Sequence, residues 1–451
     1  MSNLKVVILA AGQGTRMKSK VPKVLHKVLD KTMVDYVIDA SFKAGAEDVC
    51  VVVGHQSAMV KAMIGDRVKF ALQSEQLGTG HAVMQAADFI GDSGNILVLC
   101  GDTPLVSADT LQALNTLHSD ENNAVTVVSM LADNPFGYGR IIREDNSFAR
   151  IVEQKDASEE ELKVNEVNSG VYIFDAASLK DALSKLGNNN SQGEYYLTDA
   201  LEIIKNSGKR VGIMLAPDAE EFLGVNSKLQ LSQATDIMKK KINTQLCLDG
   251  VTIMDINNTY IGADVQIEAD TIIYPGCMIE GKTKIGTDCI IGPNTKITSS
   301  EIKNGVTIQS SVLIDAYVDN YTTIGPFAYL RPNSRIGEHV RIGDFVEIKN
   351  SNIDDGTKVS HLTYVGDSDV GKNVNFGCGT VTVNYNGKAK FRCKINDNAF
   401  IGCNTNMVAP VEIGKNAYTA AGSTITKDVP ENALAVARSR QENKEGWTMK
   451  K

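Results

Sequence analysis

The chain has 451 residues, of which 43% are hydrophobic and 22% are charged, and this composition supports about two to three packed domains rather than disorder. Its formal net charge of -8 argues against a nonspecific grip on nucleic acid or on an anionic membrane, and favours small-molecule chemistry. The 38 glycines and the single tryptophan indicate many tight turns and aliphatic packing.

The N-terminus and the cysteines predict a cytoplasmic protein. The first ten residues enter an apolar run without the basic region of a secretory signal, and no apolar run reaches the ~20 residues of a membrane span. The eight cysteines include no Cys-x-x-Cys pair, so we expect reduced and mostly buried thiols. The six histidines are scattered, and we expect no zinc site.

Residues 1–228 are predicted to form an α/β domain. Short β-rich runs alternate there with amphipathic stretches, a pattern typical of βαβ units around a mostly parallel sheet. The predicted strands are 6–9, 49–53 and 96–99, and the predicted helices are 33–44 and 82–89.

A glycine-rich turn, Leu9-Ala-Ala-Gly-Gln-Gly-Thr-Arg-Met17, follows the first predicted strand. Backbone N–H groups in such a turn can approach phosphate oxygens, and Arg16 and Lys23 add cations that suit a triphosphate. Met17 stands where a dinucleotide fingerprint needs its third glycine, and the Gly-Lys-Ser/Thr of a Walker A loop is absent. The glycines alone therefore suit a plain strand–turn–helix connection equally well.

Asp102 follows the apolar run Leu97-Val-Leu-Cys-Gly. A carboxylate at the carboxyl end of a buried strand suits a hard cation such as Mg²⁺. The alternative is a turn or helix-cap aspartate before Pro104.

Residues 229–249 are predicted to form a charged linker helix outside either core, with the lysine run 239–241 on a solvated face. Beyond residue 250 the aliphatic period becomes six, which predicts the hexapeptide repeats of a parallel β-helix through residue 451. The repeat positions are Ile261, Ile267, Ile273, Ile279, Ile285, Ile291 and Ile297, then Val318, Ile324, Leu330, Ile336, Ile342 and Ile348, then Ile401, Met407 and Ile413.

Glycine or asparagine near each aliphatic residue is expected to supply turns of positive φ. Residues 384–392 carry no hexad and are predicted to leave the coil as a loop, while residues 433–451 are predicted to form a terminal arm.

Five polar side chains recur in the β-helix at intervals close to one or two coils: Arg331, Lys349, His361, Tyr364 and Asn375. The cations suit a sugar phosphate, and the phenol and amide suit its hydroxyl groups. Without such residues the β-helix would be interpreted as a spacer or an oligomerisation element, and a lone histidine is more often structural.

The glycine turn with Pro22-Lys23 resembles the sugar-1-phosphate nucleotidyltransferases. Over nearly its whole length the chain closely resembles the bifunctional N-acetylglucosamine-1-phosphate uridyltransferase and glucosamine-1-phosphate acetyltransferase family. The further motifs are Gln73-(x)4-Gly78-Thr79, Gly101-Asp102, Tyr138-Gly139, Glu153, Asn168-Ser-Gly and Gly224-Val-Asn226. The resemblance implies a Rossmann-like α/β nucleotidyltransferase domain, then a left-handed parallel β-helix of hexapeptide repeats, and a homotrimer.

The resemblance also implies that acetyl transfer from acetyl-CoA to glucosamine 1-phosphate precedes uridylyl transfer from UTP, which releases pyrophosphate. Asp102 and Asn226 would ligate Mg²⁺. The UTP or UDP-N-acetylglucosamine contacts would be Leu9, Ala10, Ala11, Gly12, Arg16, Lys23, Gln73, Gly78, Thr79, Gly139, Glu153, Asn168 and Asn226.

By the same resemblance His361 would be the general base of acetyl transfer. Arg331, Lys349, Tyr364 and Asn375 would bind glucosamine 1-phosphate. The residues near acetyl-CoA would be Cys378, Asn384, Tyr385, Cys403, Ala421 and Arg438, with Tyr385 also bordering the sugar phosphate.

Three cysteines depart from the family pattern. Cys100 replaces a frequent tyrosine, and Cys378 and Cys403 replace alanine and serine, so we expect an altered but intact acetyl-CoA pocket. An acyl-cysteine intermediate is disfavoured because no histidine is close in sequence.

Two other functions compete with the bifunctional enzyme. In one, the β-helix only regulates or oligomerises a nucleotidyltransferase. In the other, the chain is a scaffold, which would leave Gly12, Arg16, Lys23 and Asp102 unexplained.

Overall fold

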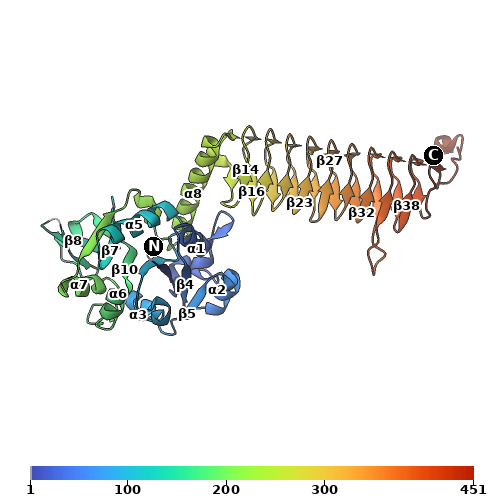
Figure 1. The fold of residues 1–451 in the computed structure, drawn as a ribbon. Coiled ribbons are helices and arrows are strands. Elements are labelled where there is room, and N and C mark those ends of the chain that lie inside the picture. Colours follow the sequence, from blue (N-terminus) through green and yellow to red (C-terminus); the bar gives the residue numbers. More distant parts are fainter. Residues whose placement is uncertain (1–2, 146, 451) are drawn as a thin grey trace. The chain divides into compact units, whose positions relative to one another are not determined.

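The computed structural model describes residues 3–145 and 147–450, and the chain divides into two compact units, Met1–Met238 and Lys239–Lys451. Figure 1 colours the first unit from blue to green and the second from yellow-green to red. Residues 1–2, 146 and 451 belong to the predicted domains but lie outside the described residues.

The first unit is built on a nine-stranded mixed sheet with the order β11-β7-β10-β6-β1-β4-β5, to which β8 and β9 are added beside β10. Neighbours β6, β1, β4 and β5 run parallel, whereas β10 runs antiparallel to both β6 and β7. The strands are β1 (Leu4–Ala10), β4 (Asp48–Val53), β5 (Lys69–Leu72), β6 (Asn95–Cys100), β7 (Val125–Leu131), β8 (Arg140–Glu144), β9 (Ser147–Val152), β10 (Glu166–Asp175) and β11 (Val211–Leu215). A separate hairpin joins β2 (Lys27–Val28) to β3 (Lys31–Thr32).

Helices cover both faces of this sheet, which explains why its central strands are continuous apolar runs rather than alternating ones. Val6 and Ile8 face one apolar cluster and Val7 faces the other. The first cluster includes α1 (Met33–Lys43), α2 (Ser57–Ile64) and α5 (Ala108–Asp120). The second includes α3 (Thr79–Met84), α4 (Ala87–Ile90), α6 (Ala176–Leu183) and α7 (Asp199–Asn206), so the helix predicted over 82–89 is in fact two short helices.

Helix α8 (Lys228–Leu248) covers the stretch predicted as a linker helix. Some of its side chains, however, pack into the apolar clusters of the two units. Ala234 is buried in a cluster of the first unit, and Ile242 and Leu246 pack against the core of the second. Lys239 is buried with its ammonium 4.8 Å from the centroid of the Tyr260 ring, so the prediction of a solvated lysine face is wrong at this position.

The second unit is a left-handed β-helix of hexapeptide repeats, whose strands form three parallel sheets. The first sheet contains β12 (Thr252–Ile253), β15 (Ile272–Ile273), β18 (Ile290–Ile291), β21 (Thr307–Ile308), β24 (Thr323–Ile324), β27 (Arg341–Asp344), β30 (Lys358–His361), β33 (Asn375–Phe376), β36 (Phe400–Ile401), β39 (Tyr418–Thr419) and β41 (Leu434–Ala435). The second contains β13 (Tyr260–Ile261), β16 (Met278–Glu280), β19 (Lys296–Thr298), β22 (Val312–Ile314), β25 (Tyr329–Leu330), β28 (Glu347–Lys349), β31 (Tyr364–Gly366), β34 (Val381–Val383), β37 (Asn406–Val408) and β40 (Thr424–Ile425). The third contains β14 (Gln266–Ile267), β17 (Lys284–Ile285), β20 (Glu301–Ile302), β23 (Ala316–Val318), β26 (Ser334–Ile336), β29 (Asn352–Ile353), β32 (Ser368–Val370), β35 (Cys393–Ile395) and β38 (Val411–Ile413).

The hexad residues form one continuous core. Every aliphatic residue of the predicted period is buried, and matching positions of successive coils pair in register, as Ile273 does with Ile291. The period of six breaks between Ile297 and Val318 because some hexads lose one residue, so that Ile302 follows Ile297 in the core. The hexapeptide prediction is therefore confirmed in its period.

Some glycines that follow an inward aliphatic residue have a reason other than the predicted positive φ. At Gly343 an added Cβ would lie 1.9 Å from the carbonyl oxygen of Ser360 in the next coil, whereas the φ of Gly343 is not positive. Left-handed turns are supplied instead by other residues, including Asn294 and Asn333. Gly343 therefore permits close stacking of coils, while glycines such as Gly276 and Gly325 provide left-handed turns as predicted, together with the asparagines.

Replacing Ile291 with alanine should destabilise the β-helix by about 2–5 kcal/mol, because its side chain is fully buried in the stack. The adjacent Ile290 offers a matched control, since it points outward and is 40% exposed. Its replacement should cost less than about 1 kcal/mol. Urea unfolding of the full chain measures both, and equal costs would contradict the inward stacking of Ile291.

Residues 384–392 leave the coil between β34 and β35 as predicted, and they form the long loop visible beside β38 in Figure 1. An isolated antiparallel bridge joins Tyr385 to Lys390 within this loop. The predicted arm begins later than residue 433, because β41 (Leu434–Ala435) still pairs with β39.

Candidate active sites

The glycine turn of the first unit lies at the carboxyl edge of the parallel strands. Leu9 and Ala10 end β1, and Ala11 and Gly12 follow directly. The chain then reverses at Gly14, whose φ is +63° and whose added Cβ would lie 2.7 Å from the Cβ of Lys23. A non-glycine residue at 14 would thus displace the lysine predicted to bind phosphate.

Four predicted phosphate and metal residues converge next to this turn. The Lys23 ammonium forms an ion pair with Asp102 Oδ2 and donates to Asn226 Oδ1 at 3.0 Å. Arg16 Nη2 donates to the same Asn226 oxygen at 2.9 Å. The backbone reinforces the arrangement, since Val225 N donates to Asp102 O at 2.9 Å. Residues 16, 23, 102 and 226, which are far apart in sequence, therefore form one cluster.

The cluster suits a divalent cation. Asp102 Oδ2 and Asn226 Oδ1 are hard oxygen donors, the type that Mg²⁺ prefers, and both already contact one cationic group, the Lys23 ammonium. Asp102 Oδ2 and Asn226 Oδ1 therefore border one position at which a positive charge is favourable.

The predicted nucleotide residues lie along the same edge. Gln73 follows β5, its backbone N donates to Val53 O at 2.8 Å, and its side chain is buried. Gln73 Nε2 donates to Gly78 O at 3.1 Å and lies 3.1 Å from His81 Nδ1. Thr79 Oγ1 accepts from Leu197 N at 3.1 Å. These contacts hold the 73–79 loop in one conformation beside the glycine turn.

The predicted sugar residues form a second group. Asn168 N donates to Gly139 O at 2.8 Å, and Glu153 Oε1 would lie 3.4 Å from a Cβ added at Gly139. Burial raises the pKa of the Glu153 carboxyl, although a hydrogen bond from Thr198 opposes the shift. Asn168 Nδ2 lies 2.6 Å from Tyr172 Oη, and burial also raises the pKa of that phenol.

Sequence reasoning did not select Tyr172 as a neighbour of the predicted sugar residue Asn168, because Tyr172 lies within an apolar strand and carries no motif. Cys100, where the family often has tyrosine, lies beside this group with its Sγ 3.8 Å from Gly170 O. Burial raises the pKa of the Cys100 thiol to about 12, so the thiol stays protonated at neutral pH.

In the second unit, the predicted sugar-phosphate residues follow the second sheet and the corner after it. Arg331 Nη1 lies 2.8 Å from Glu347 Oε1, and Lys349 Nζ lies 3.5 Å from Asp367 Oδ2. Asn384 donates to Asp367 and approaches the Tyr364 hydroxyl at 3.4 Å. The structure thus brings Lys349, Tyr364 and Asn384 together around Asp367.

The loop contributes a cation that the sequence reasoning did not select. Lys390 lies against Lys349, and this like charge lowers the pKa of the Lys390 ammonium. The available sequence signal was its place in residues 384–392, the segment without a hexad that was predicted to leave the coil. Two ammonium groups held together form a place where an anion is favoured.

His361 ends β30, and its Nδ1 lies 2.7 Å from Asp344 Oδ1 of the preceding coil. Cys378 occupies the equivalent position one coil further on, since Gly379 N donates to Leu362 O at 3.2 Å. An acyl-cysteine was disfavoured because no histidine is close to Cys378 in sequence. In the folded chain His361 lies one coil away from Cys378, so that reason no longer applies.

The predicted acetyl-CoA residues continue this column. Asn404 N donates to Cys378 O and Gly422 N donates to Cys403 O, each at 2.8 Å, so Cys378, Cys403 and Ala421 stack in successive coils. Arg438 Nη1 donates to Ala421 O at 3.0 Å. Two predicted residues stand apart: Tyr385 is exposed and donates to Gly387 O at 2.7 Å, and Asn375 lies on β33 in the first sheet.

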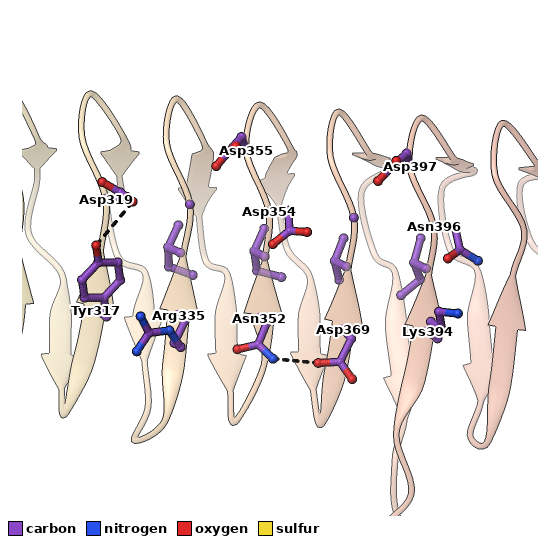
Figure 2. A pocket seen from close by; sticks show the side chains of 16 residues that line it. Tyr317, Asp319, Arg335, Asn352, Asp354, Asp355, Asp369, Lys394, Asn396 and Asp397 are labelled. Carbon is purple, nitrogen blue, oxygen red and sulfur yellow. Dashed lines mark hydrogen bonds between the residues drawn. The ribbon is translucent and has the colours of Figure 1, made fainter.

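A polar hollow of about 610 Å³ lies elsewhere, on the outer side of the third sheet. Figure 2 shows its aspartates, with Asp319 facing Tyr317 and Asp369 facing Asn352. None of the predicted site residues lines it. This hollow is therefore not the predicted acetyl-transfer site, which is an open column of side chains.

Among the described residues, no helix has the length and apolar character needed to cross a membrane. Residues 5–220 match the family model described as nucleotidyl transferase, and 258–299, 315–350 and 392–427 match that of the bacterial transferase hexapeptide with six repeats. The bifunctional protein GlmU of Thermoanaerobacter pseudethanolicus (strain ATCC 33223 / 39E) is 56% identical over 452 residues, covering 100% of this chain and 99% of that protein. The bifunctional protein GlmU of Clostridioides difficile (strain 630) is 54% identical over 450 residues, covering 100% of this chain and 98% of that protein. The chain therefore belongs to the family of bifunctional GlmU proteins, enzymes with uridyltransferase and acetyltransferase activities.

Proposed function

We propose that each unit carries one of the two activities. Residues 1–228 would transfer the uridylyl group of UTP to N-acetylglucosamine 1-phosphate, and residues 250–451 would transfer the acetyl group of acetyl-CoA to glucosamine 1-phosphate, with 229–249 as the connecting helix. The observation that carries this division is the presence of a cation-rich polar cluster in each unit, one around Lys23 and Asp102 and one around Lys349 and Asp367. Each cluster suits a phosphorylated substrate.

In the first unit, a phosphate oxygen of the sugar attacks the α-phosphorus of UTP in line, and pyrophosphate leaves. Arg16 and Lys23 neutralise the phosphates, so that positioning and charge compensation lower the barrier. Asp102 and Asn226 would hold Mg²⁺, which supplies further charge neutralisation to the phosphate oxygens when bound.

The remaining predicted residues of this unit bind the two ends of the substrates. Leu9, Ala10, Ala11 and Gly12 would hold the nucleotide through the glycine turn. Gln73, Gly78 and Thr79 would complete that site, and Gly139, Glu153 and Asn168 would hold the amino sugar.

In the second unit, the amine of glucosamine 1-phosphate attacks the thioester carbonyl of acetyl-CoA. The C–N bond forms, the C–S bond breaks, and coenzyme A leaves as its thiolate, while the Nε2 of His361 takes the amine proton. Arg331, Lys349 and Lys390 would hold the phosphate, and Tyr364 would face the hydroxyl groups. Asn375 stands apart on β33 in a single chain, and its proposed contact with the sugar phosphate would require a neighbouring chain. Acetyl-CoA lies along the column of Cys378, Cys403 and Ala421, bordered by Asn384, Tyr385 and Arg438.

A homotrimer in the cytoplasm completes the proposal. Tyr385 is exposed in a single chain, which is consistent with a neighbouring chain completing that part of the site. All eight cysteines are free thiols, which suits a reducing compartment.

A coupled assay with UTP, acetyl-CoA and glucosamine 1-phosphate tests the proposal. We expect free coenzyme A and pyrophosphate to appear together, and pyrophosphate to require prior acetylation. Light scattering of the same sample should give about three times the chain mass of 48.6 kDa. Pyrophosphate release from unacetylated sugar at the same rate would contradict the order of the two steps.

A further inference from the structure

The surroundings of His361 contain a carboxylate to which no role has been given. Asp344 ends β27 and His361 ends β30, and the two residues are direct partners in the parallel ladder. His361 Nδ1 lies 2.7 Å from Asp344 Oδ1, a separation typical of a hydrogen bond to a charged group. The pair is therefore set by strand register as well as by side-chain conformation.

The backbone after each residue reinforces this register. Phe345 and Leu362, which follow Asp344 and His361, both have a left-handed conformation, with φ of 55° and 42°. Leu362 N also donates to Asp344 O at 3.0 Å. A left-handed turn is unfavourable for such bulky residues, so the coil stacking must hold both turns in place. The side chains of Asp344 and His361 therefore project from the same corner of successive coils.

We propose that Asp344 is the positioning residue of acetyl transfer, which fixes the imidazole of His361 with its proton on Nδ1 and its free lone pair on Nε2. This inference rests on the proposed role of His361 as the base. A neutral imidazole has one donor and one acceptor nitrogen, and a carboxylate on one side selects the nitrogen that keeps the proton. Asp344 acts only through His361 and does not contact the reacting atoms.

The other groups around this pair do not compete for the same role. Arg341 lies on β27 and acts on the Asp344 carboxylate, and Lys358 lies at the start of the His361 strand. On the opposite side of His361 stands Cys378, which carries no charge as a thiol. The hydrogen bond from His361 holds the pKa of the Asp344 carboxyl below its ordinary value, so the residue is a carboxylate at neutral pH.

The test compares Asp344→Ala and Asp344→Asn in the full-length protein. We expect Asp344→Ala to lower kcat for acetyl transfer by about 10- to 100-fold, as happens when a carboxylate behind a metal-bound histidine is removed, with KM values changed by less than about twofold. Asp344→Asn keeps an acceptor and should recover part of the rate.

Two controls separate this role from a structural one. Asp355 is a similarly exposed aspartate paired with Lys372, so Asp355→Asn should acetylate at the wild-type rate. In a His361→Ala background, Asp344→Ala should cause no further loss, because its effect passes through the histidine. Uridylyl transfer should stay unchanged in every variant.

Three outcomes would overturn the proposal, for two different reasons. A wild-type rate in Asp344→Ala beside an inactive His361→Ala, or an equal loss in the His361→Ala background, would remove the role of Asp344 alone. A wild-type acetylation rate in His361→Ala would remove the assignment of the base, and the positioning role with it.

Discussion

We expect Asp102→Ala to lower uridylyl transfer by at least about a hundred- to thousandfold while acetyl transfer continues at the wild-type rate. Asp102 supplies the carboxylate of the cluster at the carboxyl edge of the first sheet, and its loss removes the charged partner of Lys23 and one of the two oxygens suited to Mg²⁺. Acetyl transfer is spared because the side chains proposed for it all lie in the other unit.

The measurement follows pyrophosphate and coenzyme A separately on one preparation of the variant. Asp92 provides a matched control, because it is also an aspartate paired with a lysine, Lys180, but lies 85% exposed away from the cluster. Asp92→Ala should retain both activities. If a folded Asp102→Ala protein lost both activities equally, the assignment of one activity to each unit would be wrong.

The second large effect concerns His361→Ala, which should lower acetyl transfer by about 10²–10⁴-fold and leave uridylyl transfer intact when N-acetylglucosamine 1-phosphate is supplied. The methyl side chain cannot accept the amine proton. N-acetylglucosamine 1-phosphate must be supplied, because in the coupled assay a variant that cannot acetylate would release neither coenzyme A nor pyrophosphate.

Cys378→Ala distinguishes direct transfer from an acyl-cysteine intermediate. Because Cys378 lies one coil from His361, a relay through its thiol is sterically conceivable, and that relay would require the thiolate as nucleophile. We expect near-wild-type acetylation by Cys378→Ala and by Cys403→Ala. A loss as large as that of His361→Ala, together with a trapped acetyl group on Cys378, would support the relay instead.

The β-helix and its loop followed from the sequence because one repeat length governs both burial and strand position. The hexad position of each aliphatic residue, such as Ile291, predicts that its side chain points into the core. The glycine positions were located correctly, but the reason for Gly343 lies in the distance to Ser360 of the next coil, which no local pattern reports.

The pairing of His361 with Asp344 was out of reach for a similar reason. A full 18-residue coil, as between Ile273 and Ile291, would place Gly343 beside the histidine. Here the coil is one residue shorter and the partner is 17 residues away. Only the three-dimensional register decides between these neighbours. The cluster of Arg16, Lys23, Asp102 and Asn226 was expected from the family motifs, whereas the contact of Lys23 with both oxygens is a property of the fold.

The stacked coils of the second unit also fix the distances between side chains along the axis of the β-helix. Adjacent parallel strands are about 4.8 Å apart, so the proposed phosphate-binding cations, the proposed base and the proposed acetyl-CoA column can change their separation only in steps of one coil. Inserting or deleting a coil between Lys349 and Cys403 would thus change the length of acyl acceptor that spans them by a fixed increment. Substitutions within a coil change the side-chain chemistry of that coil and leave the spacing between coils unchanged.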